Sequence, residues 1–92
     1  MTKIEEAFGK IIDHYGIQAQ KIKLMEELAE LIQATAKSPD GLITDGMVEE
    51  MVDVCIMIAQ FEEKFTPDQD KLATDMRAYK LRRQLMRMEE EE

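Results

Sequence analysis

The stretch EEMVDVCIMIAQF, Glu49–Phe61, decides how this chain folds. From Met51 onward it is the most apolar segment of the sequence, and it would leave almost no polar face on a helix. We expect such a helix to be covered on every side, by the other helices of the chain and by a second copy. Asp53 stands out because it carries a carboxylate into this apolar segment.

Start and stop signals divide the chain into helices. Thr2, with Glu5 three residues later, forms a capping-box pattern, and Gly16 ends or kinks the first helix. The run Ser38-Pro39-Asp40-Gly41 breaks the second, and Asp45-Gly46 opens the third. No segment alternates apolar and polar residues as a strand would. The predicted helices span about residues 2–15, 17–37, 45–65 and 67–88.

The fourth helix has the clearest start, with Thr66 as N-cap, Pro67 at the first helical position and Gln69 completing a capping box. We predict an all-α protein with a four-helix bundle-like core that is oligomeric, because a chain of 92 residues builds only a marginal core alone. Residues 1–88 form the single predicted domain. Residues 89–92 form an acidic tail.

The composition excludes several classes of function. The chain has 20 acidic and 12 basic residues, so it is poorly suited to binding nucleic acid or an anionic membrane unaided. Cys55 is the only cysteine, and we expect it to be a small core residue. No signal peptide and no membrane-spanning run is visible in the sequence, which predicts a cytoplasmic protein.

Two acidic segments share one pattern, two adjacent acids followed three residues later by a third. The second helix carries it in MEELAEL and the third in EEMVDV; the acids are Glu26, Glu27, Glu30, Glu49, Glu50 and Asp53. Within each segment the last two acids of the pattern lie one turn apart on one helix face. Because a short loop makes the two helices antiparallel, we expect the pairs to lie level within about one turn, ~5.4 Å.

Converging carboxylates need protonation, a basic partner or a metal ion. Oxygen ligands without histidine favour a hard cation, Mg²⁺ or alternatively Mn²⁺, and His14 is the only histidine. The simpler alternative is a solvated acidic helix face, in which Lys23 pairs with Glu26 and Glu27 three and four residues away.

The paired segments resemble a known signature. EELAEL followed by EEMVDV, with 19 residues between Glu30 and Glu50, is similar to the E-E-x-x-E … E-x-x-D pattern of the MazG-like nucleotide pyrophosphohydrolases, the all-α NTP pyrophosphatases. The stretch GIQAQKIKLMEELAELIQA is also similar to that family, including Gln20 and Lys23 ahead of the acids. The resemblance covers about residues 8 to 88.

The resemblance implies hydrolysis of a (d)NTP to the monophosphate and pyrophosphate with Mg²⁺. It implies that four acids hold the metal: Glu27, Glu30, Glu50 and Asp53. It implies that Glu26 orients or deprotonates the attacking water. It further implies a homodimer or homotetramer whose nucleotide pocket is partly lined by a neighbouring copy.

Five further residues are candidate substrate contacts. The resemblance assigns phosphate contacts to Lys80 and Arg83 on the fourth helix, although cations near a helix C-terminus also favour its dipole. Gln20 and Lys23 precede the acids, and Tyr15 is a candidate for stacking on the base. The alternative to an enzyme is a non-catalytic acidic helical bundle with an interaction or regulatory role.

Overall fold

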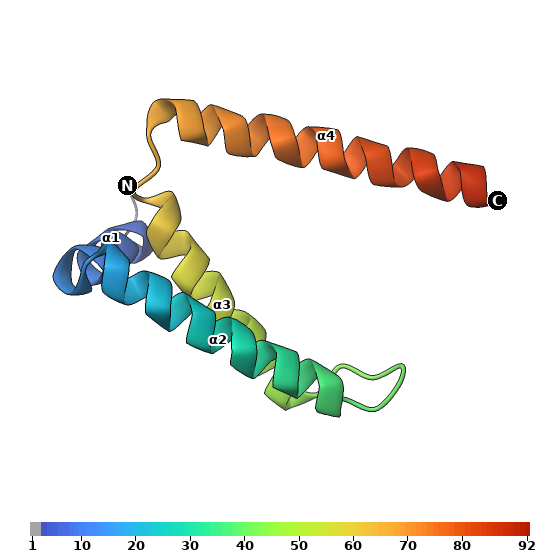
Figure 1. The fold of residues 1–92 in the computed structure, drawn as a ribbon, viewed down its shortest axis with the longest axis horizontal. Coiled ribbons are helices and arrows are strands. Elements are labelled where there is room, and N and C mark those ends of the chain that lie inside the picture. The colour runs from blue at the N-terminus through green and yellow to red at the C-terminus, as the bar shows by residue number, and fades with distance from the viewer. Residues whose placement is uncertain (1–2) are drawn as a thin grey trace.

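The computed structural model describes residues 3–92 as an all-helical chain. The helices are α1 (Lys3–Tyr15), α2 (Ile17–Lys37), α3 (Asp45–Glu62) and α4 (Pro67–Glu91). α2 and α3 pack as an antiparallel pair, and α1 contacts both of them at the end remote from the α2–α3 loop (Figure 1). The predicted all-α class is therefore confirmed.

α4 does not join this three-helix body. It extends away from it as a separate rod (Figure 1), and none of its residues over Pro67–Glu91 is buried. A bundle of four helices is thus not completed within one chain. The body formed by α1, α2 and α3 is the part that positions the candidate site.

The first two breaks between helices lie where the sequence signals place them. Gly16 ends α1 with φ of 91°, a backbone conformation that favours glycine, and α2 begins at the next residue. The loop after α2 turns at Pro39, whose carbonyl accepts a hydrogen bond from the Leu42 amide at 3.0 Å. The predicted capping box at Thr2 lies outside the described residues.

α3 is capped by Thr44, one residue before the predicted start. Its hydroxyl accepts a hydrogen bond from the Met47 amide at 3.2 Å and lies 2.9 Å from the Ser38 hydroxyl, which joins the two ends of the loop. α3 ends at Glu62 rather than near Phe65, because the amides of Lys64 and Phe65 turn back to earlier carbonyls.

The capping box of α4 is confirmed. Thr66 accepts from the Gln69 amide at 3.1 Å, and the Gln69 side chain accepts from the Thr66 amide at 3.0 Å. The helix continues to Glu91, three residues beyond its predicted end near Met88, so the first three residues of the predicted acidic tail are helical and exposed. Lengthening α4 by these acids adds surface charge but no packing.

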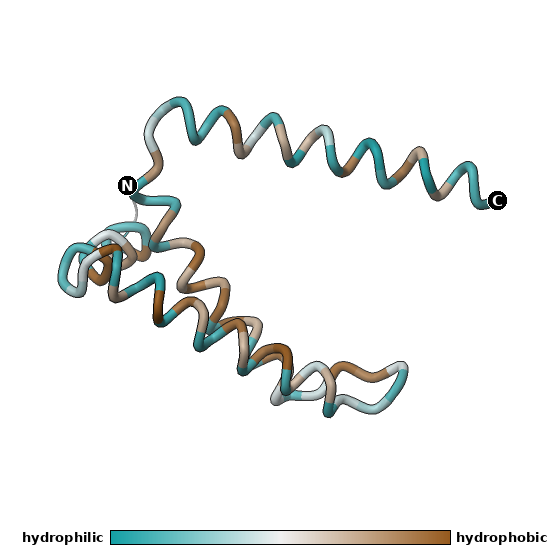
Figure 2. The backbone as a smooth tube through the Cα atoms, in the orientation of Figure 1, coloured by the Kyte–Doolittle hydropathy of each residue, from teal (hydrophilic) through white to brown (hydrophobic). Residues whose placement is uncertain are grey.

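Among residues 3–92 the buried apolar side chains are few: Ile12, Val54 and Met57. The expectation that α3 is covered on every side fails in the single chain, where Met51 and Val52 are about half exposed. Cys55 is exposed as well, so its assignment to the core was wrong. Figure 2 shows that apolar residues run along the length of α3. α4 extends away from the body and does not cover them (Figure 1).

A buried amide pair joins α2 to α3. Gln20 donates from Nε2 to Oε1 of Gln60 at 2.8 Å, and both side chains are almost fully buried. Gln60 also donates to the Met57 sulfur at 3.5 Å. Because neither amide has much access to water, each depends on the other for its hydrogen bonds.

None of the helices over residues 3–92 has the length and apolar content that crossing a membrane requires.

We predict that Gln20→Ala destabilises the protein by about 1–3 kcal/mol, because the Gln60 carbonyl oxygen then remains buried without its donor. Urea unfolding followed by circular dichroism measures the change. Gln18→Ala is the matched control, since Gln18 is exposed on the same helix. Equal free energies of unfolding for the two variants would contradict this role of the amide pair.

Candidate metal centre

Three carboxylates meet between α2 and α3. Glu27 from α2 and Glu50 and Asp53 from α3 each present an oxygen within 4.8 Å of the others, a spacing that can hold a metal ion. The expectation that the acid pairs lie level is thus confirmed for these residues. Their convergence follows from the one-turn spacing of Glu50 and Asp53 and from the short loop that makes the helices antiparallel.

Burial distinguishes this cluster from a solvated acidic face. Glu27 is only 8% exposed, and Glu50 and Asp53 are half-buried. Oε2 of Glu27 and Oε2 of Glu50 are both shielded from solvent and lack a hydrogen-bond partner within residues 3–92. A buried carboxylate oxygen without a partner costs free energy, so this pair of oxygens calls for a cation or a proton.

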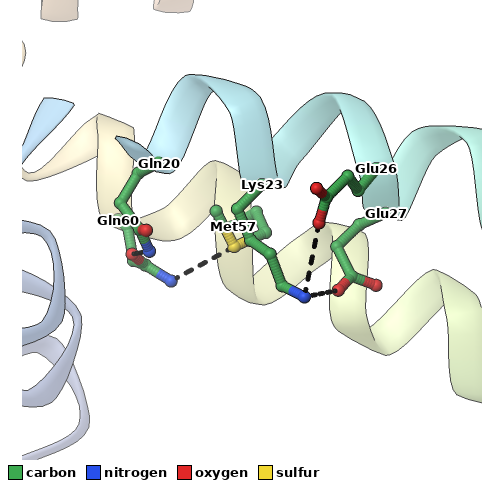
Figure 3. Close-up of polar contacts among 6 residues, drawn as sticks. All are labelled: Gln20, Lys23, Glu26, Glu27, Met57 and Gln60. Atoms are coloured by element: carbon green, nitrogen blue, oxygen red, sulfur yellow. Dashed lines mark hydrogen bonds and ion pairs between the residues drawn. The ribbon is translucent and has the colours of Figure 1, made fainter. Parts of the chain in front are cut away.

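Lys23 offsets part of the charge. Its Nζ lies 3.1 Å from Oε1 of Glu27 and 3.7 Å from Oε2 of Glu26 (Figure 3). The hydrogen bond to Glu27, together with the charge of Glu27, raises the pKa of Lys23, which therefore stays protonated. The predicted pairing of Lys23 with both acids is confirmed. It satisfies one oxygen of Glu27 and leaves the other without a donor.

Glu50 is the acid of the cluster whose pKa is clearly raised by its surroundings. Loss of solvent raises its pKa, and the negative charges of Glu30 and Asp53 raise it further. Glu30 thus acts on the cluster electrostatically, although it is exposed and lies outside the set of three converging oxygens. Of the four predicted metal ligands, three converge and the fourth lies beside them.

An open groove begins next to the acids, between α1, α2 and α3. Its volume is about 550 Å³, within the range of small-molecule sites. It brings together four of the residues singled out from the sequence, which are Tyr15, Gln20, Lys23 and Glu26. Gln20 lies at its floor, held by Gln60. The exposed carboxylate of Glu26 lies at its edge beside Lys23 (Figure 3).

A second hollow of about 460 Å³ lies toward the α2–α3 loop. Glu30 and Glu50 line it, together with Lys37 from the last turn of α2. Of the three converging acids, Glu50 thus borders this hollow, whereas Glu26 borders the first groove. Lys37 was not identified from the sequence, because a lysine at a helix C-terminus has an ordinary explanation in the helix dipole.

Lys80 and Arg83 are not brought to the cluster within one chain. Both lie on α4, which stands apart from α2 and α3 (Figure 1). The Arg83 guanidinium instead lies 5.5 Å from the centre of the Tyr79 ring on its own helix. A phosphate contact from these side chains would therefore need a neighbouring copy or a movement of α4.

Sequence reasoning missed Gln60 and Met57, which line the groove. A signal was present, because Glu50, Asp53, Met57 and Gln60 recur at intervals of three and four and so share one face of α3. Only the two acids of this face were identified as candidate site residues. Gln60 was not, because it ends an apolar run.

Comparison with family models, with characterised proteins and with solved structures yields no match for this chain.

We predict that Glu50→Gln raises the melting temperature of the protein near neutral pH in the presence of a chelator, because it removes a charge that burial and neighbouring acids oppose. The folded-state pKa of Glu50 is raised, so the stability that this residue contributes is present at acidic pH and is lost as pH rises through that pKa. The gap between variant and parent should therefore widen with pH in thermal melts.

Glu49→Gln is the control for the loss of one charge, since Glu49 is exposed on the same helix. A gap for Glu50→Gln that does not change with pH, or that is matched by Glu49→Gln, would contradict the electrostatic account.

Proposed function

We propose that this protein is a Mg²⁺-dependent nucleotide pyrophosphohydrolase that converts a (d)NTP and water to the (d)NMP and pyrophosphate. One observation carries the proposal: Glu27, Glu50 and Asp53 converge within 4.8 Å, and two of their buried oxygens lack a hydrogen-bond partner. The resemblance of both acidic segments to the MazG-like signature supports it independently of that geometry.

A divalent cation is the best of the three ways to accommodate these acids. Lys23 reaches Glu27 but leaves its second oxygen unsatisfied. Protonation of Glu50, whose pKa is raised, would remove one negative charge, whereas a divalent cation would offset the charge of all three carboxylates at once. An all-oxygen donor set fits a hard cation, so Mg²⁺ or Mn²⁺ would be held by Glu27, Glu50 and Asp53, with Glu30 beside them.

When bound, such an ion offsets the charge of the phosphates and lowers the pKa of an attached water. Glu26 lies next to the cluster, is exposed to the groove, and would accept a proton from the attacking water. The water oxygen forms a bond to the α-phosphorus, and the bond from that phosphorus to the bridging oxygen of the β-phosphate breaks. Pyrophosphate leaves with that bridging oxygen.

The groove offers the room that the nucleotide would occupy. Tyr15 is exposed at its margin, where its ring could stack on a base, and Lys23 lies between the groove and the acids. Lys80 and Arg83 would grip phosphate oxygens only from the α4 of a neighbouring copy. We therefore propose that the active form is a homodimer or homotetramer, in the cytoplasm.

We predict that Mg²⁺ raises the thermal stability of the protein, by about 2.7 kcal/mol at a hundredfold excess over its Kd. Asp53→Asn should remove most of this gain, because it takes a charged oxygen from the centre of the cluster. Glu49→Gln should keep the gain, since Glu49 is exposed outside the cluster. Differential scanning calorimetry with and without Mg²⁺ tests this. The same gain in the parent protein and in both variants would contradict a metal site at these acids.

We predict that a panel of NTPs and dNTPs with Mg²⁺ yields pyrophosphate, and that Glu26→Gln lowers its release by about 10²–10⁴-fold, the usual contribution of a general base. Glu26→Gln should keep the stabilisation by Mg²⁺, which separates proton transfer from metal binding. Orthophosphate as the product would place the attack elsewhere. No product from any nucleotide, with intact Mg²⁺ binding, would favour the non-catalytic alternative.

A further inference from the structure

The single chain exposes far more surface than a compact protein of its size. Its solvent-accessible surface is 7618 Å², whereas a folded monomer of this mass exposes roughly 5,500 Å². Its radius of gyration is 16.3 Å, against about 12.3 Å for a compact chain of this length. The excess of about 2,100 Å² per chain is larger than the roughly 800 Å² that each partner buries in a standard interface.

Part of this excess lies on the outer side of α3. We define the α3 face by Met51, Val52, Cys55 and Ile56, with Phe8 of α1 at its edge. These residues line an almost wholly apolar hollow of about 660 Å³. The four α3 residues are all exposed in the single chain. A contiguous exposed apolar surface of this kind indicates an interaction site.

The other part lies on α4. Leu72, Met76, Tyr79 and Met86 follow one another at intervals of four, three and seven residues, so they form one stripe along the helix, which we call the α4 stripe. Each of them is between 42% and 58% exposed. Arg83 lies on the same side, with its guanidinium 5.5 Å from the centre of the Tyr79 ring. Outside the stripe α4 is mostly hydrophilic (Figure 2), apart from Leu81, Leu85 and Met88 on the opposite side of its C-terminal half. A lone amphipathic helix is stable when its apolar stripe is packed against another surface.

Positive and negative side chains are also distributed unevenly between α4 and the body of α1, α2 and α3. All the arginines of the chain lie between Arg77 and Arg87, a window that contains no acidic residue. Residues 3–65 carry more than twice as many acidic as basic side chains. The window Arg77–Arg87 is thus complementary in charge to the acidic body that α1, α2 and α3 form, while α4 as a whole carries six acidic and six basic side chains.

Local contacts direct α4 away from its own body. The amides of Lys64 and Phe65 bond back to carbonyls in the last turn of α3, and the Lys64 ammonium pairs with Asp13 of α1. The capping box at Thr66 then starts α4 at once. Residues 63–66 separate the two helices, and with these contacts the connection leads α4 away from the α3 face of the same molecule (Figure 1).

We propose that two copies of this chain exchange α4, each laying its α4 stripe on the α3 face of the other. The exchange covers the apolar helix α3, gives α4 a surface to pack on, and places an arginine-rich helix against an acidic body. It extends the proposed oligomer by naming the surfaces involved. It needs neither metal nor nucleotide, so it stands or falls separately from the hydrolase proposal.

Cysteine cross-linking tests the exchange directly. Met76→Cys places a thiol on the α4 stripe, and the native Cys55 lies on the α3 face. A short bismaleimide, added without metal or nucleotide, should join the two thiols between chains and double the mass on a denaturing gel. Peptide mapping should find Cys55 joined to residue 76. Thr74→Cys is the matched control, because position 74 lies on the opposite side of α4, and it should cross-link far less.

Three outcomes would overturn the exchange. A link between Cys55 and residue 76 within one chain would mean that α4 folds back on its own body. A link only between the two introduced thiols would mean that the α4 helices of two copies pair with each other, and no link would leave the α3 face uncovered.

Light scattering gives a second measurement: Met76→Glu should halve the mass of the assembly or reduce it to a single chain, whereas Thr74→Glu should not. Both positions are exposed in the single chain, so neither change disturbs its fold.

Discussion

The structure depends on how two buried carboxylate oxygens, one on Glu27 and one on Glu50, are satisfied. They lie at the centre of the contact between α2 and α3, the most extensive contact between helices in the described part of the chain. Bringing such groups out of water opposes the packing that brings them together. A cation at this point would therefore stabilise the whole body of α1, α2 and α3, because it would bridge carboxylates of α2 and α3 where their packing is least favourable.

The same contact shows why the single chain is a poor folding unit. At one end α2 and α3 are joined by the Gln20–Gln60 amide pair, and at the centre by acids, so polar groups occupy positions that a bundle usually fills with leucine or isoleucine. Val54 and Met57 supply most of the apolar burial of α3, while its outer side stays exposed. Under the two proposals, further stability comes from outside the chain, from an ion at the acids and from a second copy on the apolar side.

The sequence predicted what is set by spacing along one helix or across one short loop. The meeting of Glu27 with Asp53 follows from such rules, and so does the capping box at Thr66. It failed where the outcome depends on the direction in which a chain leaves a helix. The exposure of Cys55 followed from a four-residue connection that points α4 away, and no apolar periodicity records that direction. The amide at Gln60 was missed because a polar residue at the end of an apolar run was read as ordinary.

The distribution of charge connects the candidate site to the assembly. The body of α1, α2 and α3 carries unsatisfied carboxylates, and every arginine of the chain lies on α4. A triphosphate with a divalent cation complements both sets of groups. Under the proposed function the cation would meet Glu27 and Asp53, on the side of α3 away from the α3 face. The guanidinium groups that meet the phosphates would then come from a copy other than the one whose α4 covers that face. Under the proposed function, a monomer could then hold the ion yet lack the groups that grip the phosphates. Metal binding and catalysis would consequently depend differently on protein concentration, since only catalysis needs the α4 of another copy.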